Sequence, residues 1–210
     1  MCEGDTEPDS PVLCRSCLNH LPLLQKPVVA ATGDVVGFTG PIYFDRSVAV
    51  FGYDDSVQKL MHMFKYRGYS NIGRILAGRL GDVLQSVDLN QFEKFVPVPL
   101  HRLRYRERGF NQAAVIAQKL STRVGVPVDL KILKRVRYTQ PQAKMDKAQR
   151  AVNVKDAFWV KPSAGFLGSS VLLVDDVFTT GSTLNEAARV LKEAGAGEIL
   201  TVTLARVELG

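Results

Sequence analysis

Residues 171–183 read VLLVDDVFTTGST, and this stretch decides the predicted fold. Four apolar residues run directly into two carboxylates, Asp175 and Asp176, and then into a segment rich in threonine, serine and glycine. A helical pattern follows over residues 183–194 and stops at Gly195. This order of buried strand, loop and helix is typical of an α/β protein with a parallel sheet.

The loop in this stretch suits a phosphorylated sugar. Ligands of open α/β sheets bind beyond the carboxyl ends of strands, where a helix start offers unpaired N–H groups to a phosphate. Gly181 lets the backbone close around phosphate oxygens. The candidate phosphate-binding hydroxyls are those of Thr179, Thr180, Ser182 and Thr183. A phosphate would repel Asp175 and Asp176, so we expect both to face ribose hydroxyls, directly or through a divalent cation such as Mg²⁺.

Three other interpretations of the loop compete with this one. The stretch has no G-K-[ST], which argues against a nucleoside triphosphate P-loop. A phospho-accepting aspartate would need an acidic pair near the domain start and a suitably placed lysine, and neither arrangement is found. A strand end with two solvated aspartates and a threonine-rich helix cap is the purely structural alternative, which the complete contiguous string disfavours.

Patterns on either side extend the α/β interpretation. Strands are predicted over 42–53, 95–98 and 199–205, and amphipathic helices over 54–65, 72–84 and 111–124. Residues 26–41 hold Pro, Gly, Ala and Thr without a regular period and predict a linker. We therefore expect a cysteine-bearing segment at 1–25 and one α/β domain at 42–210, with a hood at about 42–90 and a core at about 91–210.

The positive charge is concentrated in one part of the chain. The 210 residues carry a net charge of +6, whereas residues 101–150 hold 13 lysines and arginines against 3 acidic residues. Such an excess predicts a site for anions, either a small molecule's phosphates or those of a nucleic acid, although a solvated surface is the alternative.

The acidic start lacks signal-peptide features, and no apolar run reaches the roughly 18 residues of a membrane span. We expect a cytoplasmic protein without membrane insertion.

Two further groups of residues are candidates for binding. Arginines at alternate positions of 102–108 precede Gly109 and can offer guanidinium forks to a diphosphate, and we favour Arg106, Arg108 and Gly109 over Arg102. His101 is more typical of a solvated loop histidine.

Near the start of the chain, the spacing of Cys14 and Cys17 is that of a zinc knuckle. The predicted Zn²⁺ ligands are Cys2, Cys14, Cys17 and His20, and thiols without a structural role are the alternative.

The sequence resembles that of a known family. VLLVDDVFTTGST is similar to the diphosphoribose-binding signature of type I phosphoribosyltransferases, and other segments resemble the ComF competence-protein family within them. Those segments are MHMFKYRGY at 61–69, FVPVPLHRLRYRERGFNQAAVIAQKL at 95–120, the stretch 135–158 and GAGEILTVTLAR at 195–206. With the C-x-x-C pair, they cover most of the chain. The resemblance implies a type I phosphoribosyltransferase-like parallel sheet flanked by helices, with a zinc-knuckle N-terminus and a hood.

The resemblance also implies site roles. Phosphoribosyl diphosphate would be the ligand, with the basic stretch as its pyrophosphate loop and Mg²⁺ assisting the departure of pyrophosphate from C1 of the ribose. The polar residues 138–153 suit a flexible lid or β-ribbon that brings Gln142, Lys144 or Arg150 to the pyrophosphate, or else a surface loop without a catalytic role. The predicted catalytic residues are Asp175, Asp176, Lys144 and Arg150. The predicted hood residues are Met61, Phe64, Lys65 and Tyr66.

Two classes of function follow from the resemblance. The first is a phosphoribosyltransferase, a pentosyl-transferring enzyme, acting in DNA uptake or in nucleotide salvage on an acceptor that the sequence does not identify. The second is a non-catalytic module that binds single-stranded DNA or a partner such as a competence helicase.

The ComF pattern has two C-x-x-C pairs, and here the first pair lacks its leading cysteine. Either His20 substitutes, the zinc site is degenerate, or the true start codon lies upstream.

Overall fold

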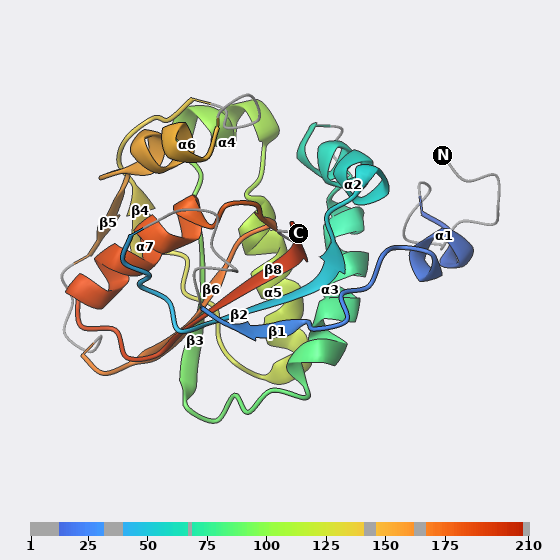
Figure 1. The fold of residues 1–210 in the computed structure, drawn as a ribbon, viewed down its shortest axis with the longest axis horizontal. Coiled ribbons are helices and arrows are strands. Elements are labelled where there is room, and N and C mark those ends of the chain that lie inside the picture. Colours follow the sequence, from blue (N-terminus) through green and yellow to red (C-terminus); the bar gives the residue numbers. More distant parts are fainter. Residues whose placement is uncertain (1–12, 32–39, 67–68, 141–145, 162–166, 208–210) are drawn as a thin grey trace.

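The computed structural model describes residues 13–31, 40–66, 69–140, 146–161 and 167–207 (Figure 1). The elements in chain order are α1 Arg15–Asn19, β1 Val28–Ala30, β2 Arg46–Gly52, α2 Asp55–Tyr66, α3 Ser70–Leu84, β3 Phe92–Pro97, α4 Arg102–Arg108, α5 Gln112–Val124, β4 Leu133–Arg135, α6 Lys147–Val154, β5 Phe158–Val160, β6 Ser170–Val174, β7 Val177–Phe178, α7 Ser182–Glu193 and β8 Ile199–Arg206. Within these residues, no helix is both long and apolar enough to cross a membrane.

The central sheet is mostly parallel. Its strands follow the order β1-β2-β8-β6-β3, and the short β7 also pairs with β8. Among the described strands of this sheet, only β1 is antiparallel to its neighbour, and β4 and β5 form a separate antiparallel pair. All eight residues of β8 are buried, as expected for a strand covered on both faces. The predicted fold class, a parallel sheet flanked by helices, is confirmed.

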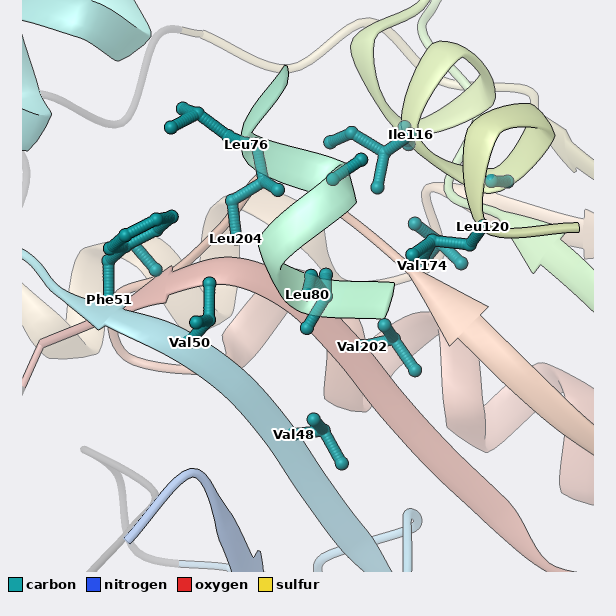
Figure 2. Packing of buried hydrophobic residues seen from close by; sticks show 14 of the residues in the cluster. Val48, Val50, Phe51, Leu76, Leu80, Ile116, Leu120, Val174, Val202 and Leu204 are labelled. Atoms are coloured by element: carbon teal, nitrogen blue, oxygen red, sulfur yellow. The ribbon is translucent and has the colours of Figure 1, made fainter. Parts of the chain in front are cut away.

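Alternate residues of β6 separate two hydrophobic layers. Leu172 and Val174 pack with residues of α3 and α5, whereas Val171 and Leu173 pack with α7 on the other face. Figure 2 shows the first layer, in which Leu80 of α3 lies beside Val202 of β8. Each such buried aliphatic side chain contributes about 1.5–3 kcal/mol. Figure 1 shows the same arrangement, with α7 on the opposite side of the sheet from α3 and α5.

The structure corrects four expectations about local structure. The predicted linker contains β1, whose three residues are too few to show a period but pair with β2 at the sheet edge. The region expected as the hood contributes β2 to the central sheet. The basic loop is largely helix α4, which ends at Gly109 in the left-handed conformation, with φ +79°. The predicted lid contains α6, which begins at a capping box of Asp146 and Gln149.

Candidate functional site

A pocket of about 360 Å³ lies beyond the carboxyl ends of three parallel strands. Tyr53 lines it just after β2, Val98 just after β3 and Asp175 just after β6. The chain leaving β3 crosses to α5 on one face of the sheet, while the chain leaving β6 crosses to α7 on the other. Adjacent strands with connections in opposite directions leave a crevice between them, which is where open α/β sheets bind ligands.

The threonine-rich loop divides between pocket and core. Thr179 and Thr183 line the pocket together with Asp175 and Asp176. Thr180 and Ser182 are buried instead, and their hydroxyl oxygens lie 2.8 Å apart in a hydrogen bond. Four of the seven residues predicted to bind ribose and phosphate therefore line the pocket, while the internal hydroxyl pair fixes the shape of the loop.

Gly181 forms the turn between this loop and α7. Its φ is +77°, a left-handed conformation that favours glycine, and its carbonyl accepts the first bond of the helix from the Asn185 N–H at 2.8 Å. A Cβ here would lie 2.7 Å from the ring of Phe178. Both the backbone conformation and the close approach of this aromatic ring therefore require glycine at this position.

The acidic pair of the loop has two distinct environments. Asp176 is buried, and its Oδ2 lies 2.6 Å from Nζ of Lys65 on α2. Burial lowers the pKa of Lys65, but the charges of Asp176 and Asp175 outweigh it and the pKa is raised, so the ammonium stays charged. Burial, together with the adjacent Asp176 charge, raises the pKa of Asp175 to about 7. The ammonium of Lys65 thus stabilises one carboxylate next to a second that resists ionisation.

Cationic side chains also line the pocket, and we call them the arginine wall. They are Arg104 and Arg108 from α4, Arg135 from β4 and Arg150 from α6. Within the described residues, Nε of Arg108 and Nε of Arg135 are buried without a hydrogen-bond partner. Buried donors of this kind are costly unless something accepts from them.

Helix α4 explains which arginines face the pocket. Residues four apart lie on the same side of a helix, so Arg104 and Arg108 share one face. Arg102 and Arg106 fall on the other side, are exposed and do not line the pocket. Of the three residues predicted to bind pyrophosphate, the structure brings Arg108 to the pocket but not Arg106 or Gly109. The alternate spacing of the arginines suggested a loop in which any of them could point to the ligand. Because the segment is a helix, Arg104 and Arg108 face the pocket instead of Arg106 and Arg108.

Sequence reasoning did not favour Arg104 among the alternating arginines, and it missed Arg135 as a pocket residue. Arg135 stacks over the Phe158 ring, with its Cζ 5.2 Å from the ring centroid, and donates to the Thr139 hydroxyl. Burial lowers the pKa of its guanidinium, which stays protonated because its ordinary value is so high. The basic composition of 101–150 was the available signal. It did not indicate which of the arginines turn inward.

The remaining predicted residues have varied positions. Arg150 lines the pocket, while Gln142 and Lys144 lie outside the described residues. His101 also lines it and accepts from the Leu103 N–H at 3.4 Å, which caps α4. Among the hood residues, Lys65 and Tyr66 line the pocket, whereas Met61 and Phe64 are buried in the core.

Comparison with known proteins connects this site to a family. Residues 108–208 match the model of the phosphoribosyl transferase domain. Competence protein F of Haemophilus influenzae is 37% identical over 168 residues, which are 78% of this chain and 73% of that protein. The chain belongs to the ComF family of competence proteins. The DNA utilization protein YhgH of Salmonella typhimurium is 34% identical over 79% of this chain and 74% of that protein.

Solved structures give a more distant likeness to this ComF-family chain. A purine phosphoribosyltransferase from Pyrococcus horikoshii is 20% identical, with a TM-score of 0.38, over 62% of this chain and 70% of that one. An adenine phosphoribosyltransferase from Leishmania donovani is 12% identical, with a TM-score of 0.40, over 80% of this chain and 74% of that one.

Two of the three cysteines of this ComF-family chain, Cys14 and Cys17, lie at α1 and do not line the pocket. Cys14 is buried at the start of α1, and its Sγ accepts from the Cys17 N–H at 3.4 Å. His20 Nδ1 lies 2.7 Å from the Ser16 carbonyl oxygen. No three metal-ligating side chains come together within the part of the chain that the structure describes, and Cys2 lies outside it. The zinc knuckle stays a prediction.

Proposed function

We propose that the pocket binds phosphoribosyl diphosphate, with the ribose on the acidic pair, the 5′-phosphate on the loop before α7 and the diphosphate on the arginine wall. The observation that carries this proposal is that groups of both charges line one pocket. Asp175 and Asp176 lie with the threonine-rich loop at the end of β6, and the arginines come from α4, β4 and α6. A ligand with a neutral diol between two anionic groups fits this distribution.

The chain would use this arrangement to promote phosphoribosyl transfer. Anchoring the 5′-phosphate at Thr179 and Thr183 fixes the position of C1, so binding far from the reacting atom orients it. Guanidinium groups of Arg104, Arg108 and Arg135 would stabilise the negative charge that develops as pyrophosphate leaves. The acceptor would enter beside Tyr53 and Tyr66. We propose a pentosyl-transferring enzyme whose acceptor is still to be identified.

Magnesium fits this pocket as a cation carried mainly by the substrate. Among the described residues that line it, Asp175 and Asp176 are the only acidic ones, and Lys65 already pairs with Asp176. The two carboxylates would therefore hold Mg²⁺ through water or through the ribose hydroxyls, in keeping with its preference for phosphate and water oxygens. Bound there, Mg²⁺ would neutralise charge on the departing pyrophosphate.

Calorimetric titration with phosphoribosyl diphosphate and Mg²⁺ tests the ligand assignment. We expect saturable binding by the parent and at least a tenfold loss in the double variant Asp175→Ala plus Asp176→Ala, because charged hydrogen bonds contribute about 1.5–3 kcal/mol each. The matched control, Asp55→Ala plus Asp88→Ala, removes two carboxylates outside the pocket and should bind like the parent. No binding by the parent would refute the proposal.

A role in DNA uptake is the second part of the proposal. It rests on the names of the relatives, a competence protein and a DNA utilization protein, and on two pairs of a cation and an exposed aromatic ring. Arg104 lies over the Tyr138 ring at 5.5 Å and Lys134 over the Trp159 ring at 5.7 Å, and the two aromatic residues are 40% and 41% exposed. Aromatic rings beside cations suit single-stranded DNA.

Fluorescence anisotropy with a labelled oligothymidylate tests the DNA assignment. We expect binding that weakens with salt and falls several-fold in Trp159→Ala, since each stacked base contributes about 1–3 kcal/mol.

Three further expectations belong to the proposal. They are a competence helicase as partner, residence in the cytoplasm, and zinc bound by Cys2, Cys14, Cys17 and His20. Metal analysis of the purified protein tests the zinc, and a stoichiometry near zero would rule it out.

A further inference from the structure

Helix α2 brings a lysine to the predicted ribose site from a distant part of the sequence. Lys65 Nζ lies 2.6 Å from Asp176 Oδ2, and both side chains line the pocket. The next residue, Tyr66, accepts from Arg108 at 3.2 Å through its hydroxyl, and its ring centroid lies 5.0 Å from the Arg108 Cζ. The last turn of α2 therefore contacts both the acidic pair and the arginine wall.

Core packing fixes where this turn lies. Phe64 is fully buried, and its ring centroid lies 5.6 Å from that of Phe110. Gly73 on α3 leaves room for the ring, because a Cβ there would lie 2.2 Å from the Phe64 Cζ. Since α2 is held by this contact, Lys65 reaches Asp176 from a rigid element. Rigid support is what a residue needs in order to hold another group in place.

The Asp176 carboxylate is held at both oxygens. Its Oδ1 accepts from the Val177 N–H at 2.9 Å, and its Oδ2 faces the Lys65 ammonium. A carboxylate oxygen has about two acceptor positions. Oδ2 is buried against Lys65, so the second position of Oδ1 is the one left for a ligand hydroxyl. If the ammonium were absent, only the backbone bond would orient the group, and the carboxylate would lie uncompensated beside Asp175.

We propose that Lys65 is a positioning residue that orients Asp176 toward a ribose hydroxyl and so makes the pocket select ribose 5-phosphates over deoxyribose 5-phosphates. This inference rests on the proposed ribose site. It gives the acidic pair a chemical selectivity, because a deoxy sugar would leave an oriented buried acceptor without its donor. Sugar phosphates of DNA would thereby be disfavoured relative to those of the ribonucleotide pool.

The experiment compares three sugars and four proteins by calorimetry. The ligands are ribose 5-phosphate, 2-deoxyribose 5-phosphate and 3-deoxyribose 5-phosphate, and the proteins are the parent, Lys65→Met, Lys65→Arg and Lys59→Met. Lys59 is an exposed lysine of the same helix that does not line the pocket, so its variant makes the same change of charge elsewhere. Thermal melting confirms that each variant is folded. Lys65→Gln replaces Lys65→Met if the latter does not fold, and we expect the same pattern with a smaller change.

We expect the parent to bind ribose 5-phosphate about tenfold more tightly than at least one deoxy sugar, and Lys65→Met to lose most of that ratio. Lys65→Met should lower the affinity for ribose 5-phosphate. It should leave the affinity for the deoxy sugar that lacks the Asp176 contact nearly unchanged. Lys65→Arg should keep part of the affinity ratio between the two sugars, and Lys59→Met should keep the full ratio of the parent. Equal weakening of all three sugars in Lys65→Met, or no weakening, would overturn the inference while leaving the ligand proposal intact. Failure of the parent to bind either ribose 5-phosphate or phosphoribosyl diphosphate would instead refute the proposed function and, with it, the inference.

Discussion

Asp175 and Asp176 are neighbours in the chain, yet their surroundings differ at the scale of single atoms. Asp176 is paired with an ammonium group, and Asp175 is placed next to the resulting carboxylate in a poorly solvated position. A pair of this kind tends to share charge unequally, because two adjacent buried carboxylates are costly to ionise together. The site therefore keeps a destabilising group where a ligand can use it, as functional sites commonly do.

Replacing Asp175 by asparagine should therefore stabilise the ligand-free protein, and by more at higher pH. The pKa of Asp175 is about 7 in the folded state, above its ordinary value of 3.8. A carboxyl group whose pKa is higher in the folded than in the unfolded state destabilises the fold once it must ionise. The parent protein therefore keeps its full stability below about pH 4 and loses part of it as the pH rises to about 7. We expect the stability gain of Asp175→Asn to be about 2 kcal/mol larger at pH 8 than at pH 5. Urea unfolding at the two pH values measures it, and a gain independent of pH would contradict the argument.

Gly181→Ala should destabilise the protein by about 2–4 kcal/mol, because it combines a left-handed backbone with overlap against the Phe178 ring. Its matched control is Gly125→Ala, at the end of α5, where φ is +80° and, apart from the adjacent residues of the chain, no described residue has an atom within 4 Å of the place that a Cβ would take. We expect the control to lose only about 1–2 kcal/mol. Chemical unfolding of both variants separates backbone strain from overlap, and equal losses would show that the ring contact does not matter.

Helix α4 shows how one element sorts residues of the same type. Arg104 and Arg108 face the pocket, while Arg102 and Arg106 face solvent. His101 caps the start of the helix and Gly109 its end, so the two capping residues fix which residues are helical. The helix thereby directs two of its four arginines toward the pocket and two toward solvent.

Single alanine variants of the four α4 arginines should fall into two classes. We expect Arg104→Ala and Arg108→Ala each to weaken binding of phosphoribosyl diphosphate about tenfold, because each removes a charged donor from the pocket. Arg102→Ala and Arg106→Ala remove the same charge from the other side and should change affinity by less than about twofold, as is usual for exposed charges. Calorimetry on all four variants tests the helix orientation, and four similar losses would support a loop with freely exchanging arginines.

At the scale of the whole molecule, folding gathers charge that the sequence distributes widely. Among the described residues, the pocket is lined by five lysine and arginine side chains, Lys65, Arg104, Arg108, Arg135 and Arg150, against two carboxylates. These groups come from helices and strands that lie far apart in the sequence and meet at the pocket. Their combined field favours a multiply charged anion beyond what any single contact provides.

Affinity for phosphoribosyl diphosphate should consequently fall with ionic strength. We expect a loss of about three- to tenfold between roughly 50 and 500 mM NaCl at constant free Mg²⁺, because the Debye length shrinks from about 14 Å to about 4 Å. The loss should be smaller in Arg104→Ala plus Arg108→Ala, which lowers the charge of the wall. Calorimetric titrations across the salt series check this, and an affinity independent of salt would contradict an electrostatic role for the arginines.

The sequence by itself determined the α/β class, the strand and helix around the threonine-rich loop, and the acidic pair, because these depend on short contiguous patterns. VLLVDDVFTTGST carries its strand, its turn glycine and its helix start within thirteen residues. Only the tertiary structure decided that β1 pairs with β2, that Arg104 replaces Arg106 at the pocket, that Arg135 joins it and that Lys65 pairs with Asp176. Lys65 and Asp176 are 111 positions apart in the chain. The direction of a side chain depends on the packing of the element that carries it, and that packing is set by contacts between segments far apart in the sequence.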